Sequence, residues 1–176
     1  MKVNGMQPVI EGSPSVLILG SMPGRKSLDQ QMYYANPRNH FWSIMSDFFG
    51  DDLTEISYET RKIYLTTRNI ALWDILQECE RTGSLDSSIR HEKFNPVHQL
   101  IETCPSIQAI GCNGTKAYQS LLKYEKETKQ LKTEIIKLPS TSPVPGKNVM
   151  NYHEKCLVWH QFLKSVIKGN TNEHRK

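Results

Sequence analysis

The sequence predicts an α/β fold of three layers, α/β/α, with helices on both faces of a central, mainly parallel four-stranded sheet. Two observations carry this prediction. Short apolar runs rich in β-branched residues alternate with longer segments whose apolar residues recur every three or four positions, as in βαβ units. The 176 residues fit one ordinary domain, and no internal repeat divides them. We therefore expect a single domain over residues 1–176, with a core of about residues 15–168 and flexible termini.

In the N-terminal half, apolar spacing and turn residues define the predicted elements. A run of Val, Ile and Leu at residues 16–19 stops at Gly20, which favours a buried strand. Asn39 begins a helical pattern of aromatic and aliphatic residues that stops near Gly50. In order, we predict a lead-in at 1–14, a strand at 16–19, a loop with one short helix at 21–38, a helix at 39–50, a second helix at 58–68, and a strand or helix at 70–76.

The C-terminal half continues the alternation. Pro96 suits the first turn of a helix, and Asn113-Gly114 suits a turn leading into the next. In order, we predict a loop at 81–90, a helix at 96–103, a strand at 107–111, a helix at 113–124, a charged surface stretch at 125–132, a strand at 133–138, a loop at 139–147, a helix at 152–168 and a disordered tail at 169–176. The segments 20–38, 111–114 and 139–147 follow strands, so they should converge at the carboxyl edge of the sheet, where such folds bind ligands.

Composition narrows the class of protein without naming it. The net charge of +4 permits a polyanionic partner but does not require one. No apolar run reaches the roughly 18 residues of a membrane helix, and no signal-peptide pattern opens the chain. We therefore expect no membrane partner and an intracellular location, cytoplasmic at the nucleoid or nuclear. The four cysteines lack CxxC spacing and zinc-finger histidines, so we predict no metal and no cofactor.

The most distinctive stretch is GSMPG at residues 20–24, followed by YYANPRNHFW at residues 33–42. One interpretation is purely structural: a tight turn after a strand, aromatic residues packed in the core, and Asn39 as the cap of a helix. The other is a ligand pocket with an aromatic wall and a positioned amide. The residues alone leave both interpretations open.

These segments resemble the uracil-DNA glycosylase superfamily, and most of all its branch of hypoxanthine-DNA (deoxyinosine) glycosylases. Two further segments agree with that branch: ALWD at 71–74, which leads to GSLDS at 83–87, and LPSTSP at 138–143. The resemblance covers roughly residues 15–165. The mismatch-specific uracil glycosylases, with an NRFW-like element, are a nearer cousin than the uracil-specific enzymes. The combination of motifs is specific, whereas any one of them alone is weak.

The resemblance implies a monofunctional DNA glycosylase of base excision repair, which flips a deaminated nucleotide out of DNA and hydrolyses its N-glycosidic bond. Hypoxanthine is the first expected base. A uracil or mismatch-specific uracil/thymine glycosylase, and a catalytically inactive DNA-binding relative, stay open as alternatives. The implied partner is DNA with a deaminated base, bound by a monomer. No lysine has the sequence context of a Schiff-base nucleophile, so we expect no strand cleavage.

The resemblance also assigns the reaction centre. Many relatives carry an Asp or Asn that handles water at the position of Met22, and a thioether cannot do this. In the hypoxanthine branch the Asn of the NHFW-like element takes the catalytic role, which is Asn39 here. Asn36 is the rival assignment. An amide is a poor base, so Asn39 is expected to position water rather than deprotonate it.

The resemblance further implies which residues touch the base and the DNA. The expected base-binding residues are Gly20, Ser21, Met22, Tyr34 and Asn113: the first three through a close backbone approach, Tyr34 by stacking, and Asn113 by reading the base edge. The expected DNA-binding residues are Ser140, Thr141, Ser142, Pro143, Val144 and Lys147. Hydroxyls and the lysine suit phosphate contacts, and either Val144 or Pro145 suits a wedge between bases.

Overall fold

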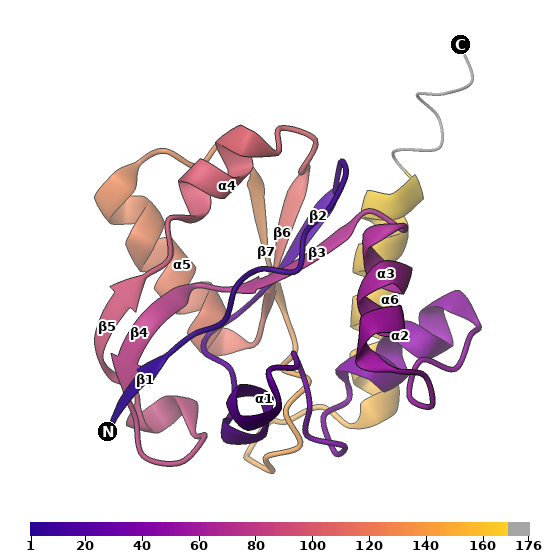
Figure 1. Ribbon diagram of the computed structural model, residues 1–176, viewed down its shortest axis with the longest axis horizontal. Helices are drawn as coiled ribbons and strands as arrows, with labels where there is room; N and C mark the ends of the chain where they lie inside the picture. Colours follow the sequence, from indigo (N-terminus) through magenta and orange to yellow (C-terminus); the bar gives the residue numbers. More distant parts are fainter. Residues whose placement is uncertain (169–176) are drawn as a thin grey trace.

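A parallel four-stranded sheet forms the centre of the fold. The computed structural model describes residues 1–168 and is shown in Figure 1. The strands lie in the order β3-β2-β6-β7, and every neighbouring pair is parallel. Their bounds are β2 (Val16–Gly20), β3 (Ile70–Asp74), β6 (Ala109–Asn113) and β7 (Glu134–Leu138). The predicted sheet and its number of strands are confirmed. The tail at 169–176 lies outside the described residues, and the single domain stays a prediction.

Side chains alternate between the two faces of this sheet because successive strand residues point in opposite directions. Val16 and Ile18 join one buried cluster, whereas Leu17 and Leu19 join a second. The first face is covered by α2 (Phe41–Phe49), α3 (Tyr58–Thr66) and α6 (Tyr152–Lys168), and the second by α4 (Val97–Thr103) and α5 (Thr115–Thr128), as Figure 1 shows. The structure is therefore the predicted three-layer arrangement.

A second, antiparallel sheet was not predicted. It consists of β1 (Lys2–Asn4), β4 (Leu76–Glu80) and β5 (Arg90–Phe94), in the order β1-β4-β5. The sequence interpretation of residues 1–14 as only a lead-in, and of 81–90 as a loop up to its last residue, missed it. The pairing of β4 with β5 contains two register shifts, which remove the regular alternation by which strands are recognised. Glu78 instead forms ion pairs of 3.2 Å with Lys2 and Lys93 on the two flanking strands.

Two short helices complete the described chain: α1 (Arg25–Gln30), the short helix expected in the loop after β2, and the 3-10 turn η1 (Asp86–Ser88). The helix α5 continues to Thr128, past the predicted end near Tyr124. The reason is that Tyr124 is the last residue of the buried stripe, so the final turn has no apolar signal. None of the helices within residues 1–168 combines the length and apolarity that a bilayer crossing demands.

Candidate functional site

The carboxyl ends of the four parallel strands bring the predicted site segments together. In the sheet register, Gly20 at the end of β2 is opposite Asp74 at the end of β3, and Asn113 at the end of β6 is opposite Leu138 of β7. Each strand end continues into one of the predicted ligand-binding segments or into β4. The convergence expected from the sequence is therefore present at this edge.

Gly20 is required by its neighbours. A Cβ placed on Gly20 would lie 2.3 Å from Oδ1 of Asp74 and 3.8 Å from the hydroxyl oxygen of Tyr34. A distance of 2.3 Å is too short for a carbon–oxygen contact, so a Cβ at this position would displace the Asp74 carboxyl, whereas glycine lets it lie against the end of β2. These three residues form the centre of the site, which we call the strand-end cluster: Gly20, Tyr34 and Asp74.

Asp74 carries the most unusual side chain in this cluster. It is 4% exposed, and its Oδ2 has no hydrogen-bond partner among the described residues. Burial, together with the nearby charge of Asp86, raises the pKa of the Asp74 carboxyl from 3.8 to about 7, although Arg81 opposes this shift. The sequence analysis did not assign this residue to the site. Its position directly after a buried strand, at the ligand-binding edge, is the signal that could have identified it.

Tyr34 lies across the cluster in a left-handed conformation with φ of 56°. Its ring stacks on Phe41, with 4.1 Å between ring centroids. Its hydroxyl is buried and faces the Asn113 amide, without a hydrogen bond of standard geometry among the described residues, and burial raises its pKa. Burying a phenol and a carboxyl without hydrogen bonds of standard geometry is costly unless a ligand supplies the missing donors and acceptors.

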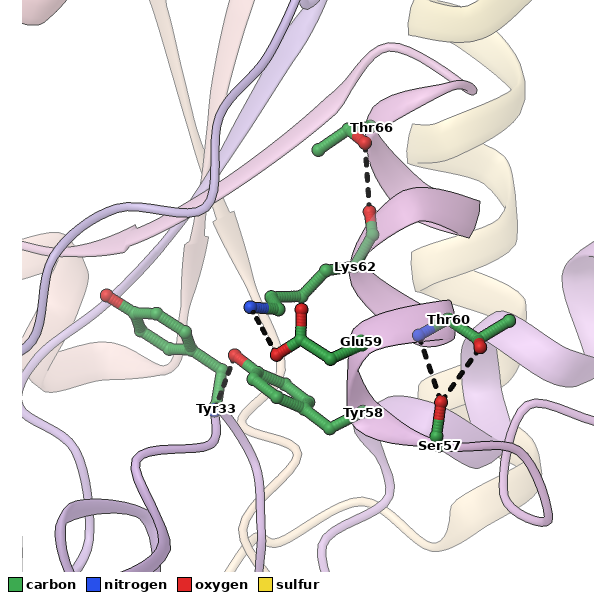
Figure 2. A network of polar contacts seen from close by, with 7 residues as sticks. All are labelled: Tyr33, Ser57, Tyr58, Glu59, Thr60, Lys62 and Thr66. Carbon is green, nitrogen blue, oxygen red and sulfur yellow. Dashed lines mark hydrogen bonds and ion pairs between the residues drawn. The ribbon is translucent and has the colours of Figure 1, made fainter.

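The adjacent Tyr33 has a different role. It is 3% exposed and its hydroxyl donates to the carbonyl of Gln7 at 2.9 Å. Its backbone N–H donates to the hydroxyl of Tyr58 at 3.2 Å, within the network that begins helix α3, as Figure 2 shows. In the same network Ser57 accepts from the N–H of Thr60 at 3.2 Å. Tyr33 thus anchors the chain before α2 to helix α3, while its neighbour Tyr34 lies at the strand ends.

Asn39, the predicted catalytic residue, lies two residues before the first residue of α2, whose N-cap is His40. Its Oδ1 accepts a hydrogen bond of 2.9 Å from the N–H of Phe41, the first residue of α2. Its own N–H donates to the carbonyl of Asn36 at 2.8 Å. The side chain is half-buried, and its Nδ2 has no partner within residues 1–168. The hydrogen bond to Phe41 therefore fixes the amide, while its two N–H donors and one oxygen lone pair stay available.

Asn113 is bound to the loop that follows β7. Its Oδ1 accepts from the N–H of Thr141 and its Nδ2 donates to the Thr141 hydroxyl, both at 2.9 Å. The carbonyl of Thr141 in turn accepts from the N–H of His40 at 2.9 Å. Thr141 is only 1% exposed, so its hydroxyl faces Asn113 rather than solvent. Thr141 therefore joins the end of β6, the loop after β7 and the residue before α2.

Lys155 of helix α6 is a further site residue that the sequence analysis missed. It is 2% exposed, yet no carboxylate lies within ion-pair distance in the described part of the chain. Its Nζ is 3.2 Å from the carbonyl of Ser142 and 3.2 Å from Nδ1 of His40. Burial lowers the pKa of Lys155, and burial together with this ammonium group lowers that of His40. The spacing of Lys155 from the buried Trp159 and Phe162 places it on the apolar face of α6, which was the available signal.

The predicted DNA-binding loop has a fixed base and an exposed apolar tip. The Ser140 hydroxyl accepts from the N–H of Ser142, and the Ser142 hydroxyl accepts from the N–H of Val144, at 3.2 and 3.3 Å.

The tip of this loop is exposed and partly apolar. Val144 is 50% exposed, as is Val149, and Met150 is 41% exposed. Lys147 is also exposed, and Pro143 is half-buried. A loop of this kind suits insertion into a partner.

The side chains of Ser21 and Met22 are held by contacts within the protein. The hydroxyl of Ser21 donates to Oδ1 of Asp86 at 2.7 Å. Met22 is 7% exposed and packs in the second buried cluster, beside Leu76. Only the backbone of these two residues can therefore face a ligand. In the described residues, no three His, Cys, Asp or Glu side chains are grouped as a metal site would need.

Two cavities lie elsewhere on the molecule. One of about 340 Å³ borders the network of Figure 2, next to Tyr33, Tyr58 and Lys62. The other, of about 450 Å³, lies between β5 and α5. Neither is lined by Asn39 or by the strand-end cluster. The chemistry available at the strand ends is distinct: a fixed amide, a stacked aromatic ring, a buried carboxyl and an apolar loop tip, which together suit a planar polar ring presented by a larger partner.

Comparison with known proteins gives one family. The model of the "Uracil DNA glycosylase superfamily" matches residues 8–163. A hypoxanthine DNA glycosylase of Methanosarcina barkeri is 35% identical over 125 residues, which cover 70% of this chain and 79% of that protein. A hypoxanthine DNA glycosylase of Methanosarcina acetivorans is 37% identical over 121 residues, which cover 68% and 77%.

A solved structure agrees with the sequence relatives. The solution NMR structure of a Methanosarcina acetivorans protein, provisionally described as a uracil DNA glycosylase, superposes with a TM-score of 0.75. It is 32% identical and the match covers 93% of this chain and 99% of that one. The likeness therefore extends over the central sheet and the helices on both of its faces.

Proposed function

The chain belongs to the uracil DNA glycosylase superfamily, and from that membership we propose that it is a monofunctional DNA glycosylase that releases hypoxanthine from deoxyinosine. Two relatives named as hypoxanthine DNA glycosylases support this substrate. The proposed partner is DNA that contains a deaminated base. We further infer that the enzyme acts as a monomer in the cytoplasm, at the nucleoid, or in a nucleus.

The observation that carries the proposal is the contrast between Met22 and Asn39. The side chain of Met22 is buried away from the strand ends, so it offers no polar group to water. Asn39 stands at the start of α2 with its amide fixed by the N–H of Phe41. A polar group for positioning water is therefore supplied by the segment after α1 rather than by the GSMPG turn.

We assign Asn39 the role of orienting the attacking water. Hydrolysis of an N-glycosidic bond develops positive charge on the sugar and negative charge on the departing base. The amide oxygen keeps one lone pair for the water, and its hydrogen bond to Phe41 reduces rotation of the group. An amide does not remove a proton at neutral pH, so Asn39 contributes by placement.

Tyr34 and the backbone of Gly20, Ser21 and Met22 are assigned to the flipped base. The Tyr34 ring already stacks on Phe41 and can extend that stack to the base, and base–aromatic stacking contributes about 1–3 kcal/mol. The second N–H of Asn113, beyond its bonds to Thr141, faces the Tyr34 hydroxyl and is assigned to the base edge beside it. The loop residues Ser140, Ser142, Pro143, Val144 and Lys147 are assigned to the DNA strand, and Thr141 to holding that loop.

The test is base release from matched duplexes that carry inosine, uracil or xanthine, with the wild type, Asn39→Ala and Asn39→Asp. We expect inosine to be the best substrate, and Asn39→Ala to lose about 10²–10³-fold of the rate. Asn39→Asp keeps an acceptor for the Phe41 N–H but has no amide N–H donors. Comparison with Asn39→Ala therefore separates the effect of losing this hydrogen bond from the effect of losing the amide group. Release of uracil alone would move the assignment to the uracil or mismatch-specific class. Release of no base would favour a DNA-binding relative without activity.

The monofunctional assignment has its own control. The product should be an intact strand with an abasic site, because a Schiff base requires an accessible lysine amine. Lys155, whose Nζ lies 3.2 Å from Nδ1 of His40, is buried. Borohydride should therefore not trap the enzyme on DNA. A trapped complex that disappears in Lys155→Met would contradict the assignment.

A further inference from the structure

We propose that Asp74 binds the flipped base as a neutral carboxylic acid, with its O–H donating to the base carbonyl and its C=O accepting from the adjacent ring N–H. This inference rests on the proposed function and adds a substrate-reading residue to it. The carboxyl group keeps its proton throughout, so the contact is a pair of hydrogen bonds and not a proton transfer.

The position of Asp74 supports a contact with the base. It ends β3 directly beside Gly20, whose lack of a side chain leaves room for the Asp74 carboxyl. Its Oδ2 and the hydroxyl of Tyr34 are both buried without partners of standard geometry within residues 1–168. Asp74 is otherwise held by its backbone, since its carbonyl accepts from Nδ2 of Asn95 at 2.8 Å. The side chain is thus left for a ligand.

The surroundings of Asp74 favour its protonated form. Burial acts first, and the carboxylate of Asp86 from η1 adds to it, so the pKa of Asp74 rises to about 7. Tyr33 and Tyr34 face it as neutral phenols. Arg81, which follows β4, is the facing cation and opposes the shift, but it donates to the carbonyl of Pro23 at 2.7 Å and forms no ion pair with Asp74 in the described structure.

The chemistry of hypoxanthine favours a neutral partner over an ionised one. Its six-membered ring presents a carbonyl beside an N–H, which matches the O–H and C=O of a carboxylic acid. An ionised carboxylate would repel the base carbonyl, and its two acceptors would instead suit guanine, which presents two adjacent donors. The O–H bond to the carbonyl also strengthens as the departing base becomes negative, so the same contact assists bond cleavage.

The experiment is the pH dependence of single-turnover inosine cleavage between pH 5.5 and 9. We expect the wild-type rate to fall as pH rises through the Asp74 pKa. Asp74→Asn offers a permanent donor and acceptor in the same shape, so its rate should be independent of pH over that limb and exceed the wild-type rate at pH 9. Asp74→Ala should lose at least tenfold at every pH.

Asp86→Asn is the matched variant that leaves Asp74 intact. It removes the neighbouring negative charge and keeps an acceptor for the Ser21 hydroxyl, so the falling limb should move to lower pH. Thermal unfolding of each variant identifies loss of folding. A flat wild-type profile with an inactive but folded Asp74→Asn would overturn the inference, because Asp74 would then act as a carboxylate. Failure of the wild type to release hypoxanthine at any pH would instead contradict the proposed function.

Discussion

Asn113 and Thr141 are joined by two hydrogen bonds of 2.9 Å. The Thr141 N–H donates to the amide oxygen of Asn113, and the amide nitrogen of Asn113 donates to the Thr141 hydroxyl. Asn113 ends β6, and Thr141 lies in the loop after β7. Because Thr141 also accepts from the N–H of His40, this pair fixes the loop and the start of α2 relative to the sheet. The residue expected to read the base is thus also a structural clamp.

Two substitutions of Asn113 separate these roles. Asn113→Ala leaves the N–H and hydroxyl of the buried Thr141 unpaired, so we expect a loss of about 2–4 kcal/mol in the free energy of unfolding. Asn113→Asp can accept from both Thr141 groups, so it should stay folded while losing the amide donor. Urea unfolding and inosine cleavage measure the two effects. An Asp variant with wild-type cleavage would remove the base-reading role and leave only the clamp.

Lys155 provides a second prediction. Lys155→Met removes a buried charge that has no carboxylate partner, so stability should be unchanged or higher. Cleavage should nevertheless fall, because the Ser142 carbonyl and His40 Nδ1 lose their donor. The pKa of His40 should rise towards its usual value, which the ring proton signals report by NMR. Lys164→Met, on an exposed part of the same helix, is the control and should change none of these.

The fold and part of the site could be predicted because their signals are local. The run at 16–19 and the helical spacing after Asn39 each describe one buried element, and the rule for parallel sheets brings their ends together. The antiparallel sheet could not be predicted in this way. Its strand β4 pairs irregularly with β5, and its stability comes from partners far away in the sequence, such as Lys2 with Glu78.

The missed site residues have the same explanation. Asp74 ends an apolar run and resembles any residue that closes a strand, and only the approach of Gly20 and Tyr34 makes it unusual. Thr141, whose hydroxyl was expected to contact a phosphate, is only 1% exposed, and that hydroxyl accepts from the Asn113 amide. Such assignments depend on which segments meet in space. The catalytic role of Asn39 and the DNA contacts stay predictions that the experiments here address.

The pKa of Asp74 also predicts how stability depends on pH. In the unfolded chain the carboxyl ionises near its usual value of 3.8, whereas in the folded protein it holds its proton up to about pH 7. The folded state therefore binds more protons between these values, and stability falls as pH rises from about 4 to 7, by up to roughly 4 kcal/mol. Asp74→Asn has no ionisable group at this position, so its free energy of unfolding should not decrease for this reason. Urea unfolding at pH 4, 6 and 8 should show an advantage of the variant that grows with pH.

The exposed tip of the loop gives the last prediction. Val144 and Met150 are 50% and 41% exposed, and an apolar side chain there can fill the space that a flipped nucleotide leaves in the duplex. Unstacking a base costs a few kcal/mol, and an apolar side chain that replaces the base in the stack offsets part of this cost. Whichever of Val144 and Met150 fills this space, its substitution by serine should lower the rate of cleavage of paired inosine by about tenfold. Cleavage of inosine in a single strand needs no wedge and should be unchanged. Leu157→Ser, which changes an exposed apolar residue on α6, is the control. A variant that slows both substrates equally would show that the loop contributes to folding or catalysis rather than to flipping.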